Sequence, residues 1–156
     1  MNQPGWRHGR IGIRIGHLVE TYLDSNDIGR TSGLDTGVVT ERDPDTVRGA
    51  DVCYLSYARL PADQDPEDYP EVAPEIIWEV RSPSDRQARV LTKVGECLNA
   101  GVLAVCVVDP QRKSLTTYRP DSPEETIGMG DVWREPGILP GFEMPVAEVF
   151  RERRGP

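Results

Sequence analysis

The sequence lacks any apolar stretch long enough to cross a membrane. Its longest uninterrupted apolar run, Val102–Val108, suits a buried strand and is far shorter than the roughly 20 residues that a bilayer requires. It also lacks a basic-then-apolar leader, because residues 1–10 are largely polar. Its 156 residues are the usual size of one domain. We therefore expect a soluble single domain over residues 1–156, with frayed ends at 1–9 and 151–156.

Cysteine is scarce, with only Cys53, Cys97 and Cys106 in the chain. None forms a CxxC pair or has a nearby histidine, which argues against a zinc site, and the odd number argues against a disulfide framework. Cys53 and Cys106 sit inside apolar runs, where a thiol packs as a small hydrophobic group. We expect three reduced core thiols and therefore a cytoplasmic protein.

Lysine is scarce as well, because only two of the 18 basic residues, Lys93 and Lys113, are not arginine. The 18 basic residues stand against 26 acidic ones, which gives a net charge of −8. This balance argues against a protein that simply coats nucleic acid, since such proteins present a basic surface to the phosphates. It does not exclude a nucleic-acid substrate, because a bound divalent metal can invert the local field. No cluster of base-reading arginines is evident from the sequence.

The middle of the chain predicts a strand, a helix and a second strand. Residues 75–81 (EIIWEVR) are expected to form a strand flanked by Pro74 and Pro83, and a helix is expected from an N-cap at Ser84 to Ala100. Gly101 can end that helix, and the β-branched run 103–108 follows as a buried strand. Such a unit pairs its strands in parallel through a right-handed crossover.

Further elements on both sides make the expected central sheet mixed and flanked by helices. The fold class is therefore α/β, or α+β in a looser accounting. The other expected elements are a helix over 10–23, strands over 33–41, 49–56 and 114–118, a short edge strand at Val132-Trp133 and a late helix over 142–150, with polar loops at 61–74 and 121–130.

Glu79 interrupts a strand that should be apolar on both faces, at the strand's carboxyl end. Open sheets bind ligands at such ends, and a buried carboxylate needs a partner. A metal or a lysine partner accounts for Glu79 as well as the alternative does, which is an edge salt bridge to Arg81 or to a neighbouring arginine. Asp51 opens the strand 49–56, and if that strand lies beside 75–81 the two acids converge. Two acids and a backbone carbonyl suit Mg²⁺; Asp51 alone reads as an ordinary strand-start residue.

Lys93 lies in the middle of the helix that follows Glu79, about 100° from the centre of its apolar stripe. From this flank its long side chain can present the ammonium at the strand end. A lysine there can orient or deprotonate an attacking water, which arginine does poorly. The ordinary alternative is a helix lysine that faces solvent.

These residues lie in segments that resemble the Uma-two family of restriction-endonuclease-like proteins, in the PD-(D/E)XK nuclease superfamily. The likeness extends from about His8 to Pro120, and its most specific part is E-V-x-S-P-S around Glu79. The segments that carry it are Gly49-Ala50-Asp51-Val52, Ala73–Arg86, Lys93, Leu98–Val102 and Val107–Pro110.

The resemblance implies a PD-(D/E)XK-like domain in which Asp51, Glu79 and the Val80 carbonyl hold Mg²⁺ or Mn²⁺. Lys93 matches a helix lysine that replaces the one usually found two residues after the acid. That usual position is Arg81, a poor general base that could still stabilise phosphate charge. Glu20 could be an auxiliary metal ligand, although a solvated helix acid is the more ordinary interpretation.

Other features depart from the family or stand outside it. Ala50 occupies a position where the family has proline, and the family usually carries a further helix and hairpin before the segment that begins at His8. His8 and His17 have no metal-ligand spacing and are interpreted as ordinary histidines.

Two functions follow from this reading. The leading one is metal-dependent hydrolysis of DNA phosphodiester bonds by Asp51, Glu79 and Lys93, and another phosphoester substrate is equally compatible with the sequence. The alternative is a catalytically inactive nuclease-like scaffold that serves as a binding or oligomerisation module, favoured by the early start, Ala50 and the acidic balance. In that case exposed apolar residues would form a homo-oligomer interface, with Trp6, Trp133 and Phe142 as candidates.

Overall fold

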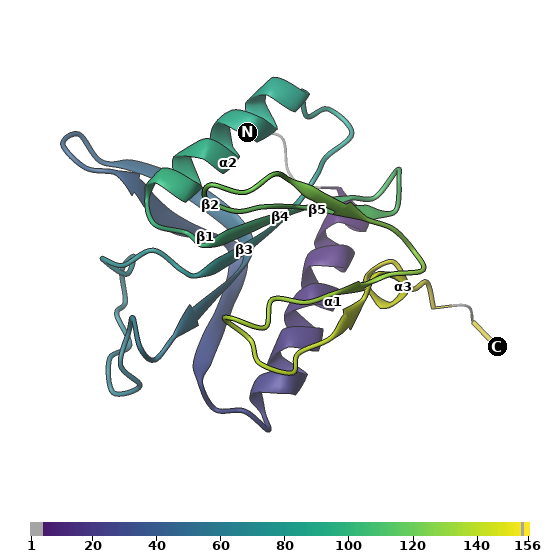
Figure 1. The fold of residues 1–156 in the computed structure, drawn as a ribbon, viewed down its shortest axis with the longest axis horizontal. Coiled ribbons are helices and arrows are strands. Elements are labelled where there is room, and N and C mark those ends of the chain that lie inside the picture. Colours follow the sequence, from purple (N-terminus) through teal and green to yellow (C-terminus); the bar gives the residue numbers. More distant parts are fainter. Residues whose placement is uncertain (1–4, 154) are drawn as a thin grey trace.

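A computed structural model describes residues 5–153, 155 and 156. Its main element is a six-stranded sheet in the order β1-β2-β3-β4-β5-β6, with helices on both faces (Figure 1). The elements are α1 (Trp6–Leu23), β1 (Gly29–Glu41), β2 (Thr46–Ser56), β3 (Ile76–Val80), α2 (Gln87–Asn99), β4 (Ala104–Asp109), β5 (Ser114–Tyr118), β6 (Glu125–Ile127), β7 (Val132–Trp133), β8 (Met144–Pro145) and α3 (Val146–Val149).

The central unit is the predicted strand, helix and strand. β3 pairs in parallel with β4, and α2 connects them, whereas every other pair in this sheet is antiparallel. Gly101 follows the end of α2 with a φ of 103°, the left-handed conformation expected of a helix-terminating glycine. The mixed α/β fold predicted from the sequence is confirmed.

Alternation along β3 divides the core between two faces of the sheet. Ile76, Trp78 and Val80 point toward α1, whose buried stripe contributes Ile11 and Ile15 to the same cluster. Ile77 points the other way, into a smaller cluster with Val94 and Cys97 of α2. Figure 1 shows the two helices on opposite sides of the strands. A residue's parity in β3 therefore decides which helix it meets.

Two of the apolar residues expected at an oligomer interface are core residues. Trp133 is 2% exposed and Phe142 is 4% exposed, and both belong to the α1-side cluster. Trp133 packs edge-on against Trp78 with ring centroids 5.3 Å apart, because the small sheet of β7 and β8 covers this end of the core. Their assignment to a surface interface was wrong, whereas Trp6 is exposed.

Several element boundaries differ from the sequence-based expectation. α1 begins at Trp6, inside the segment expected to be frayed, and residues 1–4 lie outside the described residues. α2 begins at Gln87 with Arg86 at its N-cap, so Ser84 does not cap it. Asp85 instead accepts a hydrogen bond from the Ser82 backbone N–H at 2.7 Å, which folds the preceding segment into a turn.

The remaining differences lie at the sheet edges. β1 starts four residues earlier than predicted, β6 lies inside the expected 121–130 loop, and α3 is only four residues long. Residues 151–153 carry no helix or strand. Within the described residues, no helix has the length and apolar character needed to span a membrane.

Candidate functional site

The register of β2 against β3 brings the two predicted acids to the same level. Val52 pairs with Trp78 and Cys53 with Ile77, so the next step of the antiparallel ladder sets Asp51 opposite Glu79. Asp51 Oδ2 accepts a hydrogen bond from the Val80 backbone N–H at 2.8 Å. The carboxylate therefore replaces a backbone acceptor at the carboxyl end of β3.

Glu79 is a half-buried carboxylate with one satisfied and one unsatisfied oxygen. Its side chain is 20% exposed, and Oε1 lies 2.5 Å from Lys93 Nζ. Its Oε2 is buried and has no hydrogen-bond partner in the described structure. Burial raises the pKa of Glu79 to about 7, and the charge of Asp51 adds to this effect, whereas Lys93 opposes it.

Lys93 reaches the strand end from the flank of α2, as its position on the helical wheel predicted. Its ammonium donates hydrogen bonds to Glu79 Oε1 and, at 2.6 Å, to the Gly49 carbonyl of β2. A cavity of about 180 Å³ between α2 and the sheet has Glu79, Arg81, Asp85, Arg89 and Lys93 as its charged lining residues. A group of a few atoms can therefore approach the Glu79–Lys93 pair through this cavity.

His8 joins the site from the opposite layer and was missed by the sequence analysis. Its Nε2 lies 3.1 Å from Asp51 Oδ2. The hydrogen bond to Asp51 raises the pKa of His8 against the effect of burial, and the Val80 backbone adds to the rise. With α1 starting at Trp6, His8 falls on the stripe that includes Ile11 and Ile15, three and seven residues later, and therefore faces the sheet. That spacing was the available clue.

The other candidate residues lie elsewhere. Arg81 does not pair with Glu79; its guanidinium lies 3.8 Å from Asp109 and donates to the Asp85 carbonyl. Glu20 accepts hydrogen bonds from the hydroxyl and the backbone N–H of Thr31. It is about 18 Å along α1 from His8, since each helical residue adds 1.5 Å. Glu20 is therefore not brought to the Asp51–Glu79 pair.

The donor set at the strand end suits a hard divalent cation. Among the described residues, no three His, Cys, Asp or Glu side chains are grouped so that they could hold a metal ion. The available oxygens are the two carboxylates of Asp51 and Glu79 and the Val80 carbonyl, the type of ligand that Mg²⁺ prefers when water completes its shell. The unpartnered Glu79 Oε2 is the atom whose burial such a cation would compensate.

Comparisons with known proteins bear on the family and the fold of the chain. A family model named Uma2, described as "Putative restriction endonuclease", matches residues 1–147. A crystal structure of a "putative nuclease belonging to DUF820" from Anabaena variabilis ATCC 29413 superposes with a TM-score of 0.82 at 18% identity. The match covers 96% of this chain and 83% of that one, and at this identity it shows the fold alone. The comparison with curated proteins gives no match.

Proposed function

Because the chain belongs to the Uma2 family of restriction-endonuclease-like proteins, we propose that it is a metal-dependent endonuclease that hydrolyses DNA phosphodiester bonds. The observation that supports this most is the buried Glu79 Oε2, which has no hydrogen-bond partner among the described residues and lies near a second carboxylate, Asp51. An unpaired buried carboxylate oxygen is costly, and functional sites are where such costs persist. Residues 1–156 would act as one domain.

Asp51, Glu79 and the Val80 carbonyl would hold Mg²⁺ or Mn²⁺. When bound, such a cation polarises the scissile phosphate and lowers the pKa of the attacking water. The chain supplies the remaining functions. His8 fixes Asp51 Oδ2 by a 3.1 Å contact, and the Val80 N–H fixes the same oxygen from the strand side.

Lys93 would orient the attacking water and offset negative charge on the phosphate. Its ammonium is held by Glu79 Oε1 and the Gly49 carbonyl, so its position is fixed before substrate arrives. Arg81 lines the same cavity and can contact a phosphate oxygen through its guanidinium, but a guanidinium is a poor general base.

Calorimetry and plasmid cleavage test the proposal together. We expect Mg²⁺ or Mn²⁺ to bind the natural chain and to bind Glu79→Gln at least tenfold more weakly, because one carboxylate ligand is lost. Glu143→Gln is the matched control, since Glu143 is exposed and forms an ion pair with Arg134. Equal binding by the natural chain and Glu79→Gln would refute the metal site. Lys93→Met should bind metal and still fail to nick supercoiled plasmid.

Two further proposals concern setting and assembly. Cys53, Cys97 and Cys106 are buried free thiols, which fits the reducing cytoplasm. A homo-oligomer, or an inactive scaffold that binds a partner, would depend on Trp6, the exposed member of the three proposed interface residues. A stable oligomer in light scattering, together with an absence of metal binding, would favour that alternative.

A further inference from the structure

The outer face of α1 is cationic, although the chain as a whole carries a net charge of −8. Arg7, Arg10, Arg14 and His17 follow one another at intervals of three or four residues, so they form one stripe along the helix. Glu20, near the far end, is the only acid within α1. We call the four residues the α1 stripe.

Two hollows adjoin the α1 stripe and meet at Trp6. The first, of about 390 Å³, is lined by Arg7, His8, Arg81 and Arg112, and Asp109 is the one acid among the described residues that line it. The second, of about 500 Å³, has no acid among its described lining residues. Its polar residues are Arg10, Arg14, His17, Arg151 and Arg153.

Much of this positive charge is not neutralised within the chain. Arg14 and Arg151 share Glu148, at 2.5 and 3.3 Å. Arg7 donates to the Pro110 carbonyl at 3.0 Å, which orients its guanidinium and leaves the charge intact. Among the described residues, no ion pair is formed by Arg10, Arg112 or Arg153.

An exposed aromatic side chain stands between the two hollows. Trp6 is 87% exposed, although tryptophan is usually well buried, and it begins the helix that carries the α1 stripe. Aromatic side chains beside a cationic groove are the usual platform for unpaired bases, which stack on them while the groove follows the backbone.

The first hollow adjoins the candidate active site through two of its lining residues. His8 lines it and touches Asp51 at 3.1 Å, and Arg81 lines both this hollow and the cavity of Glu79 and Lys93. A strand lying along the α1 stripe would therefore have a phosphate beside the two acids.

We propose that the α1 stripe and its two hollows bind the backbone of a single-stranded segment of DNA and that Trp6 stacks on one of its bases. The inference rests on the proposed nuclease function and specifies its substrate as DNA with an unpaired stretch. From Arg7 to His17 the stripe is about 15 Å long at 1.5 Å per residue, long enough to follow a short run of phosphates. The charge of the stripe is complementary to phosphate, and phosphate contacts dominate the affinity of such grooves.

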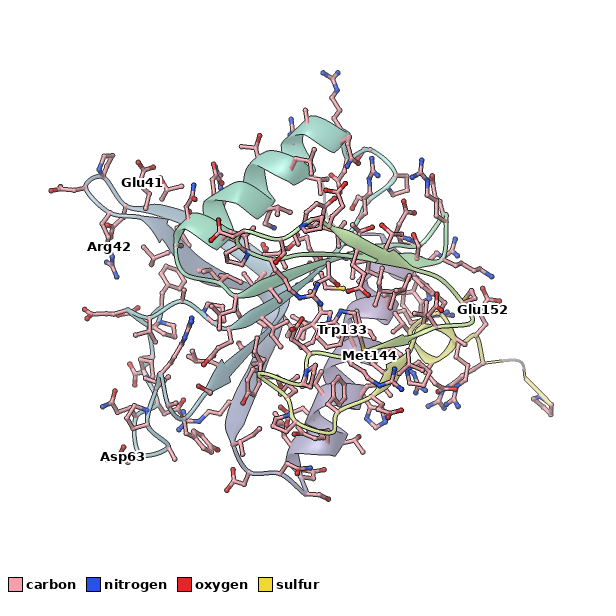
Figure 2. The ribbon with its side chains drawn as sticks, viewed as in Figure 1. Glu41, Arg42, Asp63, Trp133, Met144 and Glu152 are labelled. Atoms are coloured by element: carbon pink, nitrogen blue, oxygen red, sulfur yellow. The ribbon has the colours of Figure 1, made fainter. Side chains whose placement is uncertain are left out.

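Fluorescence anisotropy with a labelled single-stranded oligonucleotide, in EDTA so that no cleavage occurs, tests the inference. We expect Arg10→Ala and Arg112→Ala each to weaken binding several-fold and to reduce the slope of log affinity against log salt by about 0.7. Trp6→Ala should weaken it about 5- to 150-fold with an unchanged salt slope. The control is Arg42→Ala, an exposed arginine at the tip of the β1–β2 hairpin, far from α1 (Figure 2).

All four substituted side chains are exposed, so circular dichroism should show the folded spectrum for each variant. Binding by Arg10→Ala, Arg112→Ala and Trp6→Ala that equals binding by Arg42→Ala would overturn the inference. A second result would also overturn it: the chain binds no DNA, light scattering shows a dimer, and Arg10→Ala dissociates that dimer. The acidic loop 61–74 of a second copy would then occupy the α1 stripe.

The same variants separate this inference from the proposed function. In one outcome the natural chain binds DNA, the three variants bind it weakly, and Mg²⁺ produces no cleavage. The DNA-binding surface is then supported and the nuclease proposal fails. If the natural chain cleaves plasmid and the stripe variants cleave it with unchanged KM, the nuclease stands and the DNA surface fails.

Discussion

Replacing Glu79 by glutamine should make the protein more stable at neutral pH, and increasingly so as the pH rises. The carboxylate is 20% exposed, and desolvation raises its pKa from an ordinary 4.5 to about 7. The native state therefore holds a proton that the unfolded chain releases above pH 4.5. Because the native state binds more protons in this window, its free energy of unfolding falls as the pH rises from 4.5 to 7.

The magnitude follows from the two pKa values. An acid with a pKa of 4.5 in the unfolded chain and about 7 in the native state lowers the free energy of unfolding by about 2 kcal/mol as the pH rises from 5 to 7. Glutamine does not titrate and keeps an oxygen that can accept from Lys93 Nζ. The stability difference between Glu79→Gln and the natural chain should therefore widen by about 2 kcal/mol over this interval.

Urea unfolding at pH 5, 6 and 7 in EDTA, followed by tryptophan fluorescence, measures this difference. Glu143→Gln should run parallel to the natural chain, since Glu143 is exposed beside Arg134. Excess Mg²⁺ should reduce the stability difference between Glu79→Gln and the natural chain at pH 7, because a bound cation stabilises the ionised Glu79 of the natural chain. A stability difference between Glu79→Gln and the natural chain that is constant with pH would refute the desolvation argument.

Two other predictions concern the core. Burial raises the pKa of Cys53 and Cys97 to about 11 and that of Cys106 to about 12, so at pH 8 at most about one thiol in a thousand is ionised. Ellman's reagent should therefore react with all three thiols only after unfolding. Rapid labelling of the folded protein would contradict this. Trp133→Phe should lower the free energy of unfolding by about 2 kcal/mol, because it removes buried volume and the 2.9 Å hydrogen bond from Nε1 to Thr117; an unchanged midpoint in urea would show that this contact contributes nothing.

The sequence predicted the centre of the fold because local pattern and long-range pairing agree there. The apolar run around Trp78 is bounded by prolines, the helix after it has one clear stripe, and Gly101 ends it with a positive φ. The position of Lys93 on the flank of that stripe was sufficient to predict its approach to Glu79. Both depend on periods of 2.0 and 3.6 residues, which a sequence displays directly.

The sequence did not reveal features that depend on contacts between distant segments. Trp133 looks like an isolated aromatic in a polar region, and only its packing on Trp78, 55 residues earlier, buries it. His8 looks isolated for the same reason, because its partner Asp51 is brought to it by the sheet. The predicted helix over 10–23 already contains Arg10, Arg14 and His17, whereas Arg7 joins their stripe only because the helix begins at Trp6.

The candidate site also explains why both helix layers are needed for one strand end. Asp51 and Glu79 are level on neighbouring strands, and each has a nitrogen partner from a different layer: His8 from α1 and Lys93 from α2. Two carboxylates this close repel each other, as the contribution of Asp51 to the raised pKa of Glu79 indicates. Asp51 Oδ2 and Glu79 Oε1 have partners, whereas Glu79 Oε2 is buried without a hydrogen-bond partner among the described residues. The arrangement compensates the two acids enough for the chain to fold, and it leaves one oxygen free for the cation that the proposed reaction requires.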